Sequence, residues 1–300
     1  MTTQDRTRLF KMPPIVFGGN VFGWTADKKM SFYLLDALLE RGLNVIDPAN
    51  VYSYWGEGNS GGESETVIGQ WLHERKNRDQ VIIATKVGSP IGDESNNLSA
   101  VYIKEQIDLS LKRLQTDYVD IYFSHKYDES VTQLETLAAY KHLINAGKVK
   151  EIGASNFPLA VLRDAIELAK TEDLPKYNYV QPQYNLMERD GFEGDYQRFC
   201  IEENLEVISY FILASGFLTG KYQSVEETSG KARERFVKKY FTAKGNRVLN
   251  TLTTLSKKYN CSEAAIAIAW TIAQPGITAP IVSATETAHL EAFDQALKLD

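Results

Sequence analysis

The 300-residue sequence has only two cysteines and no long apolar run. Cys200 and Cys261 lie far apart, without the spacing of metal ligands, and are interpreted as free thiols in a reducing compartment. No apolar run reaches the ~18 residues that a membrane-spanning helix needs. Residues 1–9 are polar and mixed in charge, so we expect no secretory signal. These absences predict a cytoplasmic protein that does not bind membranes.

An excess of basic residues is missing as well. Lysine and arginine together number 33, against 39 aspartates and glutamates, and the net charge is −6. A nucleic-acid-binding domain needs a clustered basic face, so we expect no nucleic-acid partner. The four histidines are scattered, at His73, His125, His142 and His289. Because no cluster has the spacing of metal ligands, we expect no metal site, and a metal-dependent lyase or hydrolase is the weakest alternative.

What the sequence does contain is a repeating unit. Eight short apolar runs alternate with longer segments of helical periodicity. The runs are Ile15–Gly19, Asn44–Ala49, Val81–Val87, Tyr118–His125, Val149–Asn156, Tyr179–Asn185, Glu206–Leu213 and Ala279–Ala284. They are dense in Val, Ile and Tyr and do not alternate cleanly, which is typical of strands buried on both faces of a parallel sheet.

One of the helical segments, Val131–Ala146, illustrates the pattern. Spacings of three and four residues predict that its buried face consists of Val131, Leu134, Leu137, Ala138 and Ile144. Gly147 follows this helix, and Gly42 follows an earlier one, where a left-handed cap favours a residue without Cβ.

The repeat predicts one domain over residues 1–300, an α/β fold in which a closed parallel sheet is surrounded by helices. This is the (β/α)₈ TIM barrel, with the active site at the C-terminal rim. The alternative is a doubly wound open sheet, whose dinucleotide fingerprint needs a third glycine and a later acidic residue. The stretch Gly18–Gly23 lacks both. Residues 1–14 are interpreted as a lead-in, and the charged stretch 223–244 as a mobile cover.

Polar residues follow the second, third and fourth predicted strands. Asp47 and Lys86 end two of them, His125 ends the next, and Tyr52 lies five residues beyond Asp47. A lysine among apolar neighbours needs an anionic partner, and Asp47 can serve. We expect the ammonium of Lys86 to lower the pKa of Tyr52 from about 10 and so make the phenol a general acid. His125 would hold a carbonyl oxygen, and a cofactor would supply hydride.

Motifs along nearly the whole chain resemble the aldo-keto reductase family. They are Asn44–Tyr52, Gly62–Glu65 with Ile68–Gly69, Ile83–Val87 and Asp120–His125. The resemblance implies a catalytic tetrad of Asp47, Tyr52, Lys86 and His125. It also implies NAD(P)H-dependent reduction of aldehydes or ketones to alcohols.

The same resemblance implies a cofactor site. Ser155, Asn156 and Gln181 would hold the nicotinamide carboxamide, and Tyr210 would stack on the ring. The stretch Leu213–Tyr222 resembles the loop that covers the pyrophosphate, with Leu213, Gly216 and Lys221 as its expected contacts. Phe211 stands where the family usually has serine, so its backbone would take over that contact.

The last predicted strand departs from the family pattern. Thr285 stands where the family typically has the Arg or Lys that binds the adenosine 2′-phosphate, and His289 where a Gln often faces adenine. The hydroxyls of Ser283 and Thr285 would bind the phosphate of NADP(H), which family habit favours. Alternatively, Glu286 would accept hydrogen bonds from the free 2′-hydroxyl of NAD(H). We expect a weaker preference than usual.

The substrate is expected to be a small carbonyl compound. Phe22, Trp24, Tyr54 and Trp55 would form an aromatic wall beside the nicotinamide. The chain ends at Asp300, without the extended loop that some relatives use to select bulky substrates. A second hypothesis is a nucleotide-binding, redox-sensing accessory subunit with little turnover, because barrels of this family also serve ion channels. The sequence predicts neither the oligomeric state nor the natural substrate.

Overall fold

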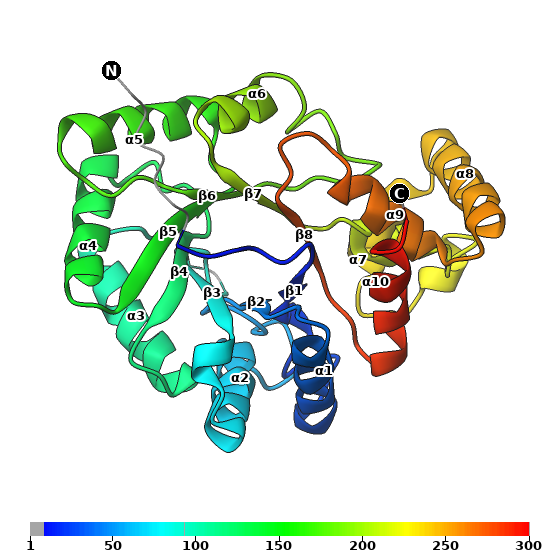
Figure 1. Ribbon diagram of the computed structural model, residues 1–300, viewed down its shortest axis with the longest axis horizontal. Helices are drawn as coiled ribbons and strands as arrows, with labels where there is room; N and C mark the ends of the chain where they lie inside the picture. Colours follow the sequence, from blue (N-terminus) through cyan, green and yellow to red (C-terminus); the bar gives the residue numbers. More distant parts are fainter. Residues whose placement is uncertain (1–8, 93, 300) are drawn as a thin grey trace.

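The computed structural model describes residues 9–92 and 94–299 (Figure 1). Most of the predicted lead-in, residues 1–8, therefore lies outside the described residues. The strands form a closed parallel barrel in chain order, which confirms the predicted fold. They are β1 (Val16–Gly18), β2 (Val45–Asp47), β3 (Ile82–Val87), β4 (Val119–Ser124), β5 (Val149–Ser155), β6 (Tyr179–Gln181), β7 (Glu206–Ser209) and β8 (Ala279–Val282).

Figure 1 shows the helices around the outside of the barrel, with α1 and α2 on one side of it and α5 and α6 on the other. They are α1 (Lys28–Glu40), α2 (Glu63–Arg75), α3 (Ala100–Leu114), α4 (Gln133–Asn145), α5 (Leu159–Thr171), α6 (Asp195–Glu202), α7 (Glu234–Val237), α8 (Ala243–Tyr259), α9 (Glu263–Ile272) and α10 (Glu291–Ala296). A 3₁₀ helix, η3 (Ala214–Thr219), follows β7.

Local sequence explains where several helices begin and end. Asp27, Ser99 and Thr132 each accept a hydrogen bond from a backbone N–H in the first turn of α1, α3 and α4. After α1 and α4, Gly42 and Gly147 have φ values of +71° and +72°, as expected of left-handed caps.

The predicted face of α4 is partly wrong. Leu134 is 49% exposed, and Ala138 is exposed too. Leu137 is buried as predicted, and Tyr140 and Leu143, which the prediction omitted, are buried with it. The ring of Tyr140 packs edge-on against Tyr122 of β4, with 5.9 Å between centroids, and this aromatic contact sets the rotation of the helix.

The alternation of side chains along each strand defines the barrel interior. One core cluster draws residues from nearly every strand and fills the inside: Val16, Val45, Ala84, Ile121, Phe123, Tyr179, Ile208, Ala279 and Ile281. The next inward position lies two residues further toward the C-terminal end of each strand. On that layer fall Asp47, Lys86, His125, Gln181, Tyr210 and Ser283. The alternation of inward and outward side chains therefore brings most of the predicted site residues to one rim.

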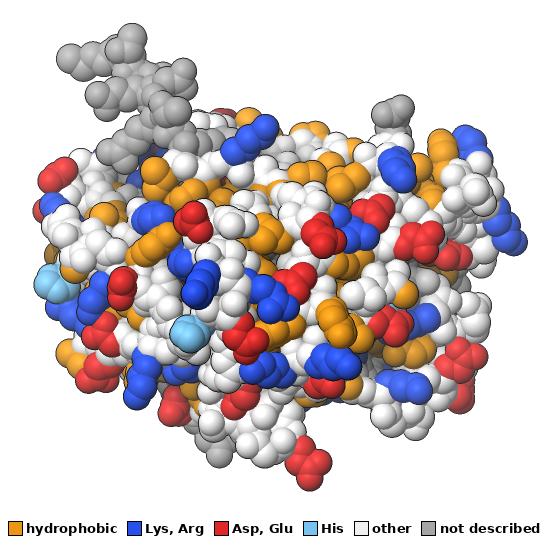
Figure 2. All heavy atoms as spheres, turned by 60° about the horizontal axis from the view of Figure 1, so that its bottom comes forward, with side chains coloured by type: hydrophobic (Ala, Val, Ile, Leu, Met, Phe, Trp, Pro, Cys, Tyr) orange, Lys and Arg blue, Asp and Glu red, His pale blue; other side chains and the backbone are white. Residues whose placement is uncertain are grey.

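One face of the molecule is mixed in charge. Figure 2 shows lysine and arginine interspersed with aspartate and glutamate on the face that it presents. Among the described residues, no helix combines the length and apolar character needed to cross a membrane. The stretch 223–244 contains α7 and short 3₁₀ turns, and Val237 and Tyr240 anchor it in a core with Phe217. Its mobility stays a prediction.

Candidate active site

A buried ion pair lies at the centre of the rim. Lys86 is fully buried, and its Nζ donates to Asp47 Oδ2 at 2.5 Å and to the Pro48 carbonyl oxygen at 2.9 Å. Burial alone would lower the pKa of Lys86, but the Asp47 carboxylate reverses this effect and the pKa is raised. Lys86 therefore remains a cation at neutral pH.

The phenol of Tyr52 is the third member of this group. Its oxygen accepts a hydrogen bond from Lys86 Nζ at 3.3 Å, and the ammonium also lies 4.7 Å from the ring centroid. The expected lowering of the Tyr52 pKa is wrong for this arrangement. Burial raises the pKa of Tyr52, Lys86 offsets only part of that increase, and Asp47 adds to it. Tyr52 is therefore protonated at neutral pH, as a proton donor must be.

The loop that carries Tyr52 is held by the start of α2. The Tyr52 carbonyl oxygen accepts hydrogen bonds from the N–H groups of Gly62 and Ser64, at 2.8 and 3.2 Å. The Glu63 carboxylate accepts from the backbone N–H groups of Ser53, Ser60 and Gly61, at 2.7 to 3.2 Å. Sequence reasoning did not assign Glu63 a role, although it lies inside the recognised Gly62–Glu65 motif.

His125 faces Tyr52 across the same space. Their ring centroids are 5.7 Å apart and the rings meet edge-on. Burial lowers the pKa of His125 well below its ordinary value, and the charges of Lys86 and Lys126 lower it further. The ring is therefore neutral at pH 7 and can donate one hydrogen bond. Its Nδ1 is buried without a hydrogen-bond partner among the described residues, so the ring has an unused polar atom.

The residues expected to hold the carboxamide form one hydrogen-bonded chain. Asn156 Nδ2 donates to Ser155 Oγ at 3.0 Å, and Ser155 Oγ donates to the Gln181 carbonyl oxygen at 2.8 Å. Tyr210 OH donates to Asn156 Oδ1 at 2.6 Å, at the far end of the chain. Gln181 Nε2 donates to Asp47 Oδ1 at 2.8 Å, a contact that the sequence did not predict. The amide thus joins the expected cofactor residues to the Asp47–Lys86 pair.

The loop after β7 has an unusual backbone. Phe211, Ala214 and Ser215 have φ values of 57°, 47° and 58°, which side chains with a Cβ rarely adopt. Gly216 follows with φ 98°, and Lys221 lies against it, since a Cβ on Gly216 would be 3.2 Å from the Lys221 Nζ. Such strain clusters at ligand sites, and consecutive turned N–H groups make concavities that suit phosphate. Leu213 immediately precedes η3 in this loop.

The residues expected at the adenosine end do not form one cluster. Ser283 Oγ lies within hydrogen-bond distance of the Gly18 carbonyl oxygen, at 2.8 Å, and of Asn20 Oδ1, at 2.7 Å. Thr285 lies beside His289, whose Nδ1 is 3.4 Å from the Thr285 backbone N–H. His289 Nε2 is 3.1 Å from Glu286 Oε1. A carboxylate, rather than a cation, therefore lies beside Thr285.

Among the four expected wall residues, Trp55 contacts both Trp24 and Tyr54. The Trp55 ring lies 5.5 Å from Tyr52, 5.5 Å from Tyr54 and 5.7 Å from Trp24. The prediction for Phe22 is wrong. Phe22 is fully buried and stacks on Phe17 at 5.3 Å, so it belongs to the core behind the wall.

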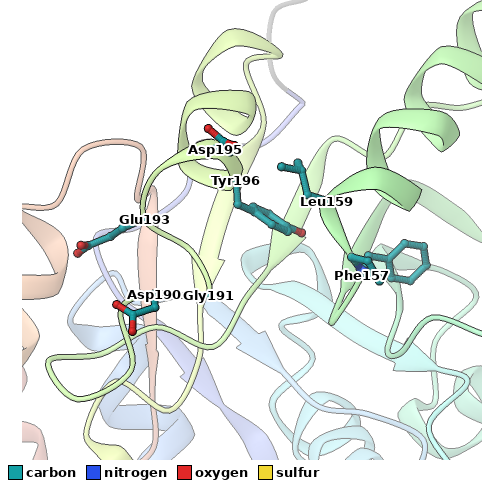
Figure 3. Close-up of a pocket in the computed structure, with 8 residues that line it drawn as sticks. Phe157, Leu159, Asp190, Gly191, Glu193, Asp195 and Tyr196 are labelled. Atoms are coloured by element: carbon teal, nitrogen blue, oxygen red, sulfur yellow. The ribbon is translucent and has the colours of Figure 1, made fainter.

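A groove of about 430 Å³ lies between the start of α5 and the loop before α6 (Figure 3). It is lined by Phe157, Pro158, Leu159, Asp190, Gly191, Glu193, Asp195 and Tyr196. None of the predicted catalytic or cofactor residues is among these. Within the described residues, no three His, Cys, Asp or Glu side chains are grouped as a metal site requires.

The model of the aldo/keto reductase family matches residues 14–300. The chain belongs to this family. The aldo-keto reductase YhdN of Bacillus subtilis is 31% identical over 287 residues, which cover 93% of this chain and 81% of the relative. The uncharacterized oxidoreductase YrpG of the same organism is also 31% identical, over 99% of this chain and 91% of its own length. Norsolorinic acid reductase B of Aspergillus parasiticus is 28% identical, over 95% of this chain and 74% of its own length.

Family membership confirms the resemblance inferred from the motifs. It makes this aldo/keto reductase a carbonyl-reducing oxidoreductase, and the family generally uses nicotinamide cofactors. Sequence reasoning missed the role of Glu63 and the hydrogen bond from Gln181 to Asp47. Glu63 holds the loop that carries Tyr52, and the Gln181 amide holds the Asp47 carboxylate.

Proposed function

We propose that this aldo/keto reductase reduces small aldehydes and ketones to alcohols, with Tyr52 as the proton donor. The observation that carries the proposal is the position of the Tyr52 phenol, 3.3 Å from the buried ammonium of Lys86 and edge-on to His125. When bound, a reduced nicotinamide cofactor supplies the hydride. The chain of Ser155, Asn156 and Gln181 and the turned loop after β7 are the residues that would hold it.

Each residue of the tetrad has a separate task in this proposal. Tyr52 donates its proton to the carbonyl oxygen, and Lys86 stabilises the phenolate that remains. Asp47 keeps Lys86 charged, and Gln181 holds the other carboxylate oxygen. His125, being neutral, donates a hydrogen bond to the carbonyl oxygen as negative charge develops there. A neutral imidazole has no acidic proton to give at pH 7, which supports Tyr52 as the donor.

The test compares the native protein with Tyr52→Phe, by following NADPH and NADH oxidation with an activated aromatic aldehyde. The variant keeps the ring and loses only the acidic hydroxyl, so kcat should fall about 10²- to 10⁴-fold while the nucleotide Kd is unchanged. An unaltered kcat would contradict the assignment of Tyr52. A native protein that binds nucleotide tightly but reduces none of a panel of aldehydes would favour the redox-sensing alternative.

The nucleotide is proposed to be NADP(H), with a weak preference over NAD(H). Family habit favours NADP(H), and Thr285 offers a hydroxyl near the expected 2′-phosphate. Against it, the Ser283 hydroxyl is directed to Gly18 and Asn20, and Glu286 places a carboxylate beside Thr285. We expect the Kd values of NADP⁺ and NAD⁺, measured by fluorescence titration, to lie within about a hundredfold of each other. A thousandfold difference would refute the weak preference.

A further inference from the structure

A second buried ion pair lies behind the rim, between α2 and α3. Arg113 Nε donates to Glu65 Oε2 at 2.7 Å, and the Glu65 side chain is fully buried. The other carboxylate oxygen, Oε1, accepts the hydroxyl of Thr85 at 2.5 Å. Thr85 precedes Lys86 on β3, and the two side chains point to opposite faces of the strand. Glu65 therefore connects α3 to the strand that carries Lys86.

The same arginine packs on the turn that holds the Tyr52 loop. Gly62 has a φ value of +88°, and a Cβ there would lie 2.5 Å from both Cδ and Nε of Arg113. The Arg113 side chain thus occupies the space that a side chain at residue 62 would need. The Gly62 N–H in turn donates to the Tyr52 carbonyl oxygen at 2.8 Å. Gly62 is therefore the one residue between Arg113 and the backbone of the proposed proton donor.

The position of Arg113 is restricted by the close packing of the two helices. A Cβ on Gly69 of α2 would lie 2.0 Å from the Arg113 carbonyl oxygen and 2.8 Å from the Leu114 Cα, so the end of α3 lies directly on α2. Arg113 Nη2 also donates to Ser110 Oγ at 3.2 Å. With its backbone against α2 and its guanidinium bound at two places, the Arg113 side chain has little freedom to move.

We propose that Arg113 is a positioning residue, which acts through Gly62 and Glu65 to hold the Tyr52 phenol against Lys86. This inference rests on the proposed function. The distance from Lys86 Nζ to the Tyr52 oxygen, 3.3 Å, is already long for a hydrogen bond, so a small shift of the turn at Gly62 would break it. Displacement of a reacting group by about 1 Å can lower a rate about a hundredfold.

Arg78 offers a matched control for the loss of a buried ion pair. Its Nη2 lies 2.7 Å from Oδ2 of the buried Asp120, and its side chain is 17% exposed, against 23% for Arg113. Arg78 comes before β3, at the end of the strand away from Lys86. Arg113→Gln and Arg78→Gln each remove an arginine from a buried carboxylate, so both should lower the free energy of unfolding in urea.

Only Arg113→Gln should alter catalysis. We expect its kcat for an activated aromatic aldehyde to fall about tenfold to a hundredfold, with KM within a few-fold and the nucleotide Kd unchanged. The alkaline limb of its pH profile should move to higher pH, because a phenol that loses the Lys86 charge has a higher pKa. Arg113→Lys keeps a cation within reach of Glu65 and should restore most of kcat. Arg78→Gln should leave kcat and the pH profile as in the native protein.

If Arg113→Gln does not fold, the double variant Arg113→Gln, Glu65→Gln replaces it, since two amides leave no buried charge unpaired. The same fall in kcat is expected, because the shorter side chain no longer covers Gly62.

Three results would overturn the inference. They are an unchanged kcat, an equal fall in Arg78→Gln, and a weaker nucleotide Kd with an unaltered pH profile. The first and second would assign Arg113 to stability alone, and the third to the cofactor site. If Tyr52→Phe loses activity while Arg113→Gln keeps it, only this inference fails. If Tyr52→Phe keeps native activity, the proposed function fails and this inference with it.

Discussion

At residue 153 the barrel has no room for a side-chain carbon. A Cβ on Gly153 would lie 2.3 Å from Cε1 of the Phe123 ring. Phe123 in turn occupies the inward position directly below His125 on β4. The glycine therefore lets an aromatic ring fill the barrel beneath the layer of the proposed catalytic residues.

Gly153→Ala should accordingly lower the free energy of unfolding. Overpacking of a rigid core costs about 1–3 kcal/mol, because the Phe123 ring or the β5 backbone must shift. Urea denaturation measures the loss. Gly191→Ala is the control, since a Cβ there would meet nothing within 4 Å and its φ is not positive. Equal stability of the two variants would show that the barrel interior is more adaptable than the contact suggests.

At the scale of elements, the loop between β2 and α2 is organised by one carboxylate. The Glu63 carboxylate accepts hydrogen bonds from backbone N–H groups at both ends of the loop, including that of Ser53, which follows Tyr52. We propose that Glu63 acts through Tyr52, as a positioning residue.

We expect Glu63→Gln to lower kcat by about tenfold to a hundredfold with little change in the nucleotide Kd, because small displacements of a catalytic group cost that much. The variant should also retain the aldehyde KM within a few-fold. Glu57→Gln, at an exposed position of the same loop, is the matched control. A rise in KM at constant kcat would mean that Glu63 shapes the substrate wall and does not position the phenol.

The helices and strands could be predicted from the sequence where their positions depend on residues that are close together along the chain. Strand runs and caps depend on neighbouring residues, so their positions agree with the structure to within a few residues. The face of α4 depended on a distant partner, Tyr122 of β4, and was partly wrong for that reason. The prediction that Phe22 belongs to the aromatic wall was wrong for a similar reason, because the sequence does not show which side chain of the first loop packs on Phe17.

For the whole molecule, the repeat determined the barrel, and the barrel brought the strand-end residues together. Asp47, Lys86 and His125 were predictable because each stands at a strand end and parallel strands share a rim. The sign of the Tyr52 pKa shift was not, because it depends on how far the surrounding protein excludes water from the phenol.

The position of Tyr52 beyond the end of β2 has a further consequence. The other three residues of the proposed tetrad take their places from strand register, which the packed interior maintains. The position of the Tyr52 phenol depends instead on the length of the segment after β2, since only residues 48–51 separate Tyr52 from Asp47. One inserted residue there would leave every strand intact and still carry the hydroxyl away from Lys86. The length of this short connection therefore sets the distance between the phenol and the Asp47–Lys86 pair.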